Sequence, residues 1–556
     1  MANKCARVGV RNRLLTILIV CVWLTCGGLA LAAPPAPSTA PAEGGPKGEP
    51  TDKLAVTTHQ ITINGAPFKY TATAGYMPLK DETGKLRANI FFIAYTKSPP
   101  LEVPDRAGAS APTTTPVAPG THAPGSDGIS SPDGKGDPTR PITFIFNGGP
   151  GAAAVWLHLG AAGPYRIMLN DRGEALPPPY RLAENQSTWL SDSDLVFIDP
   201  VSTGYSRAAT PDQAKEFHNF HEDISSLGEF IRLYLTRYER WGSPKFVAGE
   251  SYGGTRAAAL ADYLPERLGI ALNGVVLISP ALSFLTISPS DANDLGFALY
   301  LPGYTAAAWY HHKLPPDLQA DQAKALADAE AFALTTYVTA LAQGSNLAPA
   351  QRRTVLDQLA RYSGLSTDYL DKANLRVDPS RFEKALLADS KDGARIIGRF
   401  DSRLTAFTAD PLAADSEFDP SLSTILPVYA GAFNSYVRAT LHYESDLPYE
   451  VLKHIAFDLQ GEGMVYVGDS LRAAVQKNPN LKVLVAAGRF DLAVPFAATD
   501  YAVAHLGLPA PLRANVKQAY YPGGHMFYHE PAALRQFHDD VAALIRDATA
   551  HPAVAR

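Results

Sequence analysis

The stretch that decides the fold runs from residue 246 to residue 254 and reads Phe246-Val247-Ala248-Gly249-Glu250-Ser251-Tyr252-Gly253-Gly254. It begins as an apolar strand, contains a G-x-S-x-G motif, and continues into an Ala-rich helical segment over 255–264. A serine between a strand and a helix is typical of a nucleophile elbow, in which small neighbours permit a tight turn that exposes the hydroxyl. The start of the helix favours developing negative charge. We therefore predict Ser251 as a nucleophile, the alternative being a serine in an ordinary Gly-rich turn.

A nucleophilic serine needs a base and a group that orients the base. On folds with such an elbow, the three residues occur in the order Ser, then Asp or Glu, then His. Asp491 follows an apolar run over 482–487, and His525 lies in a Gly-rich loop after the last expected strand. Taken singly, Asp491 would be a strand-end cap and His525 a turn residue. Their order and their placement at strand ends predict a triad with Ser251 at one sheet edge.

A second Gly-rich segment predicts an oxyanion hole. It reads Phe144-Ile145-Phe146-Asn147-Gly148-Gly149-Pro150-Gly151, a strand that ends in consecutive glycines. Glycines let backbone N–H groups approach a substrate without obstruction, as in the oxyanion loops of esterases. A phosphate-binding loop is the competing interpretation. It requires a Lys-Ser/Thr or a G-x-G-x-x-G continuation, whereas Ala152-Ala153-Ala154 follows here.

Outside these motifs, the chain contains short runs that are apolar on both faces. They cover residues 142–146, 195–198, 245–248, 275–279 and 482–487. Strands of this kind belong to a parallel sheet covered by helices. An alternating hairpin over 59–70 and a strand over 89–95 predict an antiparallel edge, and apolar residues at three- and four-residue steps predict a helix over 212–237. The predicted class is α/β, with a mostly parallel central sheet flanked by helices.

The chain divides into segments of different composition. Residues 283–455 are Ala-rich and helical in pattern, without buried-strand runs, so we expect a helical insertion, or cap, over the sheet. The sheet domain is expected over 53–282 and 456–556. Within it, residues 99–140 are rich in Pro, Gly, Thr and Ser and predict a long mobile loop. Residues 33–52 have scarcely any large apolar side chain and predict a disordered linker.

The first 32 residues predict a secretory signal peptide. They hold four basic residues and no acidic one, and an apolar run over 14–31 ends in the small-x-small pattern Ala30-Leu31-Ala32. An uncleaved membrane anchor is the alternative. All three cysteines lie in this leader, so the mature chain would have no disulfide and no cysteine metal ligand. We expect an exported protein, periplasmic or secreted, without stable membrane insertion once the leader is removed.

Composition limits the classes of partner. The 556 residues are 46% hydrophobic, which supports a large core and excludes disorder over the whole length. Lys and Arg number 49 against 55 Asp and Glu, a net charge of −6 without a basic cluster, so nucleic acid is not an expected partner. His311-His312 and His529 lack accompanying ligands at metal spacing. We therefore expect surface or packing histidines and no metal.

Several motifs, in this order, resemble the blocks of the serine carboxypeptidase family. They are Asn147-Gly148-Gly149-Pro150-Gly151, Phe197-Ile198-Asp199-Pro200, Thr203-Gly204-Tyr205-Ser206, Glu250-Ser251-Tyr252-x-Gly254 and Gly524-His525-Met526. The resemblance spans about residues 142 to 545 and is strongest at the blocks. The chain looks like a bacterial exported member of this family.

The resemblance implies an α/β-hydrolase fold and assigns roles to the motif residues. Ser251 would be the nucleophile, His525 the general base and then acid, and Asp491 the orienting carboxylate. The backbone amides of Gly149 and Tyr252 would form the oxyanion hole.

The resemblance also implies how the substrate's terminal carboxylate is held. The residues would be Asn147, Gly148 and Glu250. A carboxylate beside Glu250 requires a protonated glutamic acid, because like charges repel in a shielded site, so an acidic working range is expected. Two positions depart from the family pattern: Ile145 stands where the family usually has Trp, and Ala161 where it has a second Glu. In the family, the two glutamic acids form a carboxyl pair that shares a proton. This chain has only one member of that pair, Glu250.

The predicted function is that of a serine-type carboxypeptidase, which hydrolyses C-terminal peptide bonds through an acyl-enzyme. Its substrates would be peptides with a free C-terminus, and the chemistry needs no cofactor. An esterase or acyltransferase on the same triad is one alternative. A non-catalytic binding protein on a hydrolase scaffold is another. The sequence indicates neither the preferred side chain nor the oligomeric state.

Overall fold

The structure is a computed structural model of the chain and describes residues 53–98, 135–413, 416–459 and 465–550. These residues belong to one unit that spans residues 49–556. The predicted signal peptide (1–32) and linker (33–52) lie outside the described residues, as does most of the predicted loop over 99–140. Among the residues described, no helix combines the length and the hydropathy that a membrane crossing requires.

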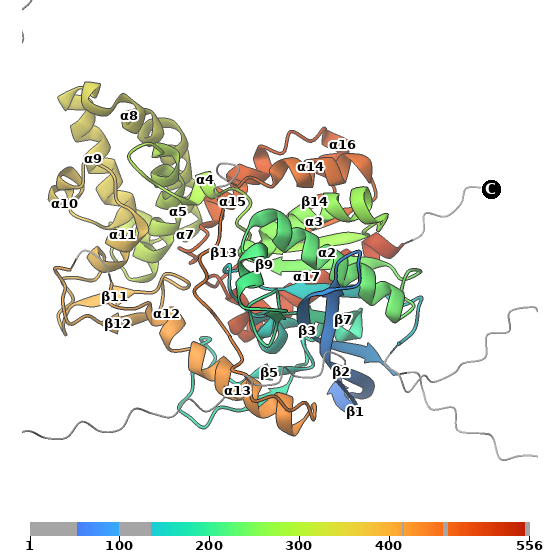
Figure 1. The fold of residues 1–556 in the computed structure, drawn as a ribbon. Coiled ribbons are helices and arrows are strands. Elements are labelled where there is room, and N and C mark those ends of the chain that lie inside the picture. The colour runs from blue at the N-terminus through green and yellow to red at the C-terminus, as the bar shows by residue number, and fades with distance from the viewer. Residues whose placement is uncertain (1–52, 99–134, 414–415, 460–464, 551–556) are drawn as a thin grey trace, which may run out of the picture. The chain divides into compact units, whose positions relative to one another are not determined.

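A sheet of ten strands forms the centre of the fold (Figure 1). Its strand order is β1-β2-β3-β7-β4-β9-β10-β13-β14, and β8 pairs with β3. The strands from β7 to β14 run parallel, whereas β1, β2, β3 and β7 pair antiparallel. The predicted mostly parallel sheet is confirmed. The strand bounds are β1 (Leu54–Ile63), β2 (Ala66–Lys80), β3 (Leu86–Lys97), β4 (Ile142–Phe146), β7 (Asp194–Ile198), β8 (Arg207–Ala208), β9 (Lys245–Glu250), β10 (Gly274–Ile278), β13 (Lys482–Gly488) and β14 (Val516–Tyr521).

The predicted antiparallel edge is also confirmed. β1 and β2 form a hairpin whose turn residues, Asn64 and Gly65, have φ values of 52° and 79°. Both residue types tolerate this left-handed region, and the resulting turn matches the twist of the strands. β7 lies between β3 and β4, so one sheet continues across the segment 99–134, as the sequence predicts.

Helices cover both faces of the sheet. Successive side chains of each strand point to opposite faces, so one strand contributes to the core on each side. Phe144 and Phe146 of β4 belong to one core, and Ile145 belongs to the other. The helices of the first core are α2 (Phe220–Arg237), α3 (Tyr252–Leu268) and α14 (Gly468–Lys477). Those of the second core are α1 (Val155–Leu157), α13 (Leu426–Ala439) and α17 (Pro531–Thr549). The helix predicted over 212–237 begins at 220, because the side chain of Asn219 caps it.

The predicted insertion over 283–455 divides between two cores. Helices α5 to α11 bury their apolar side chains in a separate core, which also includes Leu492. By contrast, Val428, Tyr429 and Phe433 of α13 pack in the core on the sheet. The bounds are α4 (Phe284–Ile287), α5 (Asp294–Tyr310), α6 (Pro316–Gln319), α7 (Gln322–Phe332), α8 (Val338–Gln343), α9 (Pro349–Ser363), α10 (Thr367–Lys372), α11 (Pro379–Ala385) and α12 (Pro420–Ser423).

Two small strand pairs complete the fold, together with α15 (Phe496–Ala504) and α16 (Ala510–Arg513). One pair is β5 (Tyr165–Ile167) with β6 (Leu182–Glu184), and the other is β11 (Arg395–Ile397) with β12 (Thr405–Phe407). The second pair lies in the segment that was expected to be helical without strands. Three residues are too few to show the alternation that identifies a strand in sequence. The extent of the insertion as a cap stays a prediction.

Candidate active site

Ser251 occupies a sharp turn between β9 and α3. Its φ and ψ are 62° and −124°, a region that residues with a side chain rarely adopt. The backbone is held by hydrogen bonds of 2.9 Å from the Ser251 amide to the Ile278 carbonyl and from the Gly254 amide to the Ser251 carbonyl. A Cβ atom on Gly249 would lie 1.9 Å from the Gly253 carbonyl oxygen. Only glycine at position 249 therefore allows this elbow.

His525 and Asp491 form a buried hydrogen-bonded pair. His525 Nδ1 lies 2.7 Å from Asp491 Oδ2, and the two residues are 2% and 0% exposed. Asp491 Oδ1 accepts from the amides of Ala493 and Val494 at 2.7 and 2.9 Å, which fixes the carboxylate. Burial lowers the pKa of His525, but the Asp491 carboxylate outweighs it and the net shift is upward. The Asp491 carboxylate therefore stabilises the protonated form of the imidazole, which allows His525 to accept a proton.

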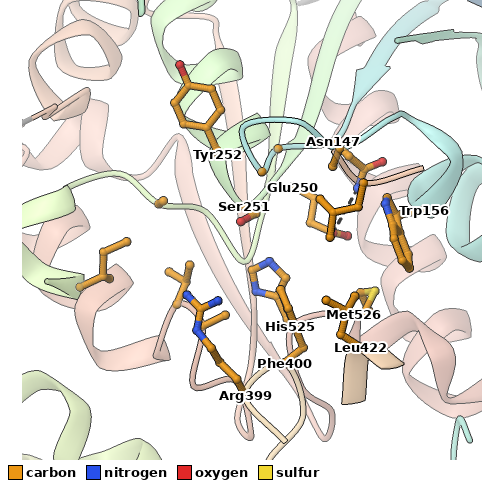
Figure 2. A pocket seen from close by; sticks show the side chains of 18 of the residues that line it. Asn147, Trp156, Glu250, Ser251, Tyr252, Arg399, Phe400, Leu422, His525 and Met526 are labelled. Carbon is orange, nitrogen blue, oxygen red and sulfur yellow. Dashed lines mark hydrogen bonds between the residues drawn. The ribbon is translucent and has the colours of Figure 1, made fainter. Parts of the chain in front are cut away.

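Ser251 and His525 line the same pocket. Figure 2 shows the imidazole next to the Ser251 side chain. Since Nδ1 bonds to Asp491, Nε2 is the ring nitrogen that remains for the serine hydroxyl. In the described part of the chain no hydrogen bond joins the hydroxyl to the imidazole; such contacts often tighten only when a substrate binds.

The predicted oxyanion loop follows β4 and packs against the elbow. A Cβ atom on Gly148 would lie 2.5 Å from the Tyr252 amide nitrogen, so the loop and the first turn of α3 are in direct contact. Gly149 has a φ of 99°. A Cβ atom on Gly151 would lie 2.0 Å from the Lys453 carbonyl oxygen. The Tyr252 amide is the first of α3, where a helix offers no acceptor of its own, so it remains for a substrate oxyanion.

A buried ion pair supports the oxyanion loop from behind. Arg256 of α3 pairs with Asp223 of α2 at 2.7 Å, and both side chains are at most 5% exposed. Arg256 also donates to the carbonyls of Asn147 and Gly148. One cation therefore connects two helices to the backbone of the loop.

Asn147 and Glu250, predicted to hold a substrate carboxylate, are hydrogen-bonded to each other. Asn147 Nδ2 donates to Glu250 Oε1 at 3.1 Å (Figure 2). Asn147 Oδ1 accepts from the Leu157 amide. Burial raises the pKa of Glu250 to about 7, against the lowering effects of His525 and of a hydrogen bond from Tyr528. At mildly acid pH this glutamic acid is therefore mostly protonated, as the sequence argument requires.

Tyr528 is a site residue that the sequence argument missed. Its hydroxyl donates to Glu250 Oε2 at 2.5 Å, and its ring lies against Gly160, where a Cβ atom would approach ring carbon Cε2 to 2.7 Å. Gly160 and the buried Ala161 stand in the segment where the family carries a second Glu. Small residues there leave room for the Tyr528 ring. The available signal was an aromatic residue three positions after His525.

A loop between β11 and β12 holds His525 and the backbone next to Asp491 in place, which the sequence did not predict. The His525 amide donates to the Phe400 carbonyl at 2.5 Å, and the Leu492 amide donates to the Arg399 carbonyl at 3.0 Å. The Ser402 amide donates to the Phe490 carbonyl at 3.0 Å. The loop over 399–402 is therefore bonded on both sides of Asp491 and at His525.

The other histidines named in the sequence have ordinary partners. His529 lies 2.9 Å from the Tyr429 hydroxyl, and burial lowers its pKa to about 3. His311 Nε2 lies 2.8 Å from the Ser402 carbonyl oxygen. No cluster of three His, Cys, Asp or Glu side chains suited to a metal ion occurs among the described residues.

The strand order, the elbow and the buried His–Asp pair define the class: an α/β-hydrolase fold with the residues of a serine hydrolase. The chain belongs to the serine carboxypeptidase family, whose sequence model matches residues 131–530.

Individual relatives match shorter stretches. The pheromone-processing carboxypeptidase KEX1 of Saccharomyces cerevisiae is 30% identical over 148 residues, which cover 25% of this chain and 18% of the yeast protein. Serine carboxypeptidase-like 33 of Arabidopsis thaliana is 29% identical over 143 residues, or 23% of this chain and 26% of the plant protein. The matches thus span about a fifth to a quarter of these relatives. The solved structure of VinJ is 13% identical, with a TM-score of 0.35, over 86% of this chain and 99% of VinJ.

Proposed function

We propose that this protein is a serine-type carboxypeptidase that removes C-terminal residues from peptides. The observation that carries the proposal is a single pocket lined by Ser251, His525, Asn147 and Glu250. It combines the residues of acyl transfer with a buried, hydrogen-bonded carboxyl beside the nucleophile, whose pKa is raised to about 7. An endopeptidase or a general esterase has no need of the second feature.

The proposed reaction begins when Ser251 Oγ attacks the scissile carbonyl carbon and its proton passes to His525 Nε2. The Asp491 carboxylate stabilises the imidazolium, and the amides of Gly149 and Tyr252 bind the oxyanion. The C–N bond then breaks as His525 returns the proton to the leaving amine. A water molecule, deprotonated by His525, hydrolyses the Ser251 ester and restores the free serine.

The leaving residue is the C-terminal amino acid, and its carboxylate would lie at Asn147, Gly148 and Glu250. A protonated Glu250 donates a hydrogen bond to this carboxylate, whereas an ionised one repels it. A free C-terminus is therefore the feature that the site selects.

The location of the protein is part of the proposal. The basic and apolar leader with its small-x-small pattern supports export, to a periplasm or to the medium, by a bacterial cell. Peptides outside the cytoplasm would be the substrates.

The test compares an N-blocked dipeptide acid with its C-terminal amide, for the wild-type protein, Ser251→Ala and the control Ser345→Ala on an exposed turn. We expect the wild type and the control to release the C-terminal amino acid from the acid much faster than from the amide. Ser251→Ala should lose at least about 10³-fold in kcat, since the nucleophile is removed. Equal release by the wild type and Ser251→Ala refutes the proposal.

An esterase or acyltransferase is the second candidate, because Ala161 removes one member of the family's carboxyl pair. The same substrates distinguish the two functions. A protein that cleaves ester and amide analogues as well as the free acid does not recognise the terminal carboxylate.

A further inference from the structure

One cation in the active-site pocket has no role in the reaction described above. Of the residues that line the pocket, Glu250, Arg399 and His525 are ionisable at neutral pH. Glu250 is buried and has a raised pKa of about 7. Below pH 7, Arg399 is therefore the permanent charge of this pocket, and no lining carboxylate offsets it.

The backbone of Arg399 is fixed, but its guanidinium is not occupied. The Arg399 amide donates to Asp419 Oδ1 at 3.2 Å, and its carbonyl accepts from the Leu492 amide. The residue is exposed, and within the described part of the chain no ion pair joins its guanidinium to a carboxylate. Its recorded neighbour is the Phe400 ring, 5.5 Å from the guanidinium carbon. All five of its N–H donors are thus free for a ligand.

Two carboxyl groups close to Arg399, those of Asp419 and Glu383, form no ion pair with its guanidinium, although Asp419 Oδ2 is buried without a hydrogen-bond partner among the described residues. Asp419 Oδ1 accepts from the amides of Arg399 and Ser421 and from the Ser421 hydroxyl. Burial raises the pKa of Glu383 to about 8, so this residue carries little charge at or below neutral pH. His525 is the titratable group on the other side, and Arg399 disfavours its charged form. An anion from outside is therefore the partner that this cation lacks.

The position of Arg399 indicates which part of a peptide it meets, given the proposed function. Figure 2 shows Asn147, Glu250 and Trp156 on one side of His525 and Arg399 on the other. If the C-terminal residue occupies the Asn147 side, the residue that is acylated onto Ser251 extends toward Arg399.

We propose that Arg399 selects substrates with a carboxylate side chain on the penultimate residue, Asp or Glu. A planar guanidinium binds a carboxylate through two parallel hydrogen bonds. This inference rests on the proposed function and names the substrate class of the same site.

The test measures kcat/KM at pH 6 for N-blocked Glu-Leu, Gln-Leu and Leu-Leu acids. The wild type should prefer Glu over the isosteric Gln by about tenfold or more, since the neutral amide cannot form the charged hydrogen bonds that a carboxylate makes with a guanidinium. Arg399→Gln should reduce this ratio to about one. The control Arg353→Gln, which removes an exposed arginine paired with Asp357 in α9, should keep it. The preference should also fade below about pH 4, where the substrate side chain becomes protonated.

The outcomes separate this inference from the proposed function. Equal cleavage of the Glu and Gln peptides by the wild type overturns the inference alone. An Arg399→Gln protein that keeps the preference for Glu over Gln also overturns the inference. The same holds if Arg399→Gln lowers kcat/KM by the same factor for all three acids, because Arg399 would then bind the terminal carboxylate. A wild type that releases leucine from none of them overturns both.

Discussion

Under the proposed function, Glu250 would set the pH range in which a substrate carboxylate binds beside it. Its pKa is raised to about 7 by burial, and the hydroxyl of Tyr528 and the amide of Asn147 hold its two oxygens. With Ala161 in place of a second Glu, no carboxyl there can share its proton. Burial supplies the upward shift instead, and a tyrosine supplies the hydrogen bond. Recognition of a free C-terminus should therefore fail as the pH rises through about 7.

Removal of the Tyr528 hydroxyl should move this limit. The hydrogen bond from Tyr528 favours ionised Glu250 and lowers its pKa. In Tyr528→Phe we expect the alkaline limb of the kcat/KM profile for a free-acid peptide to shift upward by about one pH unit, because a hydrogen bond to a charged group contributes about 1.5–3 kcal/mol. The measurement is kcat/KM from pH 4 to pH 9.

The matched control is Tyr429→Phe. Tyr429 is also buried, but its hydroxyl bonds to His529 rather than to Glu250. The alkaline limb of the kcat/KM profile of Tyr429→Phe should coincide with that of the wild type. If Tyr528→Phe lowers activity by one factor at every pH, the hydroxyl has only a structural role and the argument for Glu250 is wrong.

The loop between β11 and β12 connects the predicted insertion to the candidate active site. Besides its backbone contacts to His525 and Leu492, it carries Asp401 and Arg403. Asp401 accepts from the Gly524 amide at 3.2 Å, and Arg403 donates to the Pro522 carbonyl at 2.9 Å. The loop is therefore bonded to the segment that carries His525, the proposed general base.

Arg403 is the central charge of this contact. It lies between the carboxylates of Asp401 and Glu530, and the three side chains are 12–18% exposed. In Arg403→Met both carboxylates lose their partner, so we expect the free energy of unfolding to fall by about 3 kcal/mol. Ser251 should also react more slowly with a fluorophosphonate, because the His525 loop is less firmly held. Urea unfolding and the labelling rate measure the two effects.

The control for this prediction is Arg352→Met, which breaks an ion pair with the half-exposed Asp371. It should cost about 1 kcal/mol or less and leave labelling unchanged. A destabilised Arg403→Met protein that labels at the wild-type rate contradicts the link between the loop and the general base.

The difference between local and distant contacts explains what the sequence could predict. The apolar run over 142–146 coincides with β4, and the elbow was evident because strand, serine and helix are adjacent. Tyr528 reaches Glu250 across 278 positions, and no local pattern marks such a contact. The packing of α13 on the sheet was missed for the same reason, since amphipathic spacing does not indicate which core a helix joins.

Three buried carboxyl groups make the free energy of unfolding depend on pH. Burial raises the pKa of Asp199 and Glu250 to about 7 and that of Glu383 to about 8. Unfolded, these groups titrate near 4. Between these values the folded state binds more protons than the unfolded state, so stability falls as the pH rises through this window. The buried His158 and His529, with pKa values lowered to about 3, act in the opposite direction but only below about pH 6.5.

Above about pH 6.5 the two histidines no longer contribute to the pH dependence of stability, and the three carboxyl groups still do. A substitution of Glu383 tests the effect of one of these carboxyl groups by itself. It lies in α11, is 7% exposed, and its Oε1 has no hydrogen-bond partner among the described residues. Asp419 and Asp378 raise its pKa further, against Arg399. Glu383→Gln keeps the shape of the protonated side chain but cannot ionise. We expect it to raise the free energy of unfolding by about 3–4 kcal/mol more at pH 8 than at pH 5, where the gain should be about 1 kcal/mol or less. Urea unfolding at the two pH values measures this difference.

The exposed Glu216→Gln should change neither value by more than about 0.5 kcal/mol. An equal gain from Glu383→Gln at pH 5 and pH 8 would mean that Glu383 is already ionised in the folded protein at pH 5, and that burial does not govern its protonation.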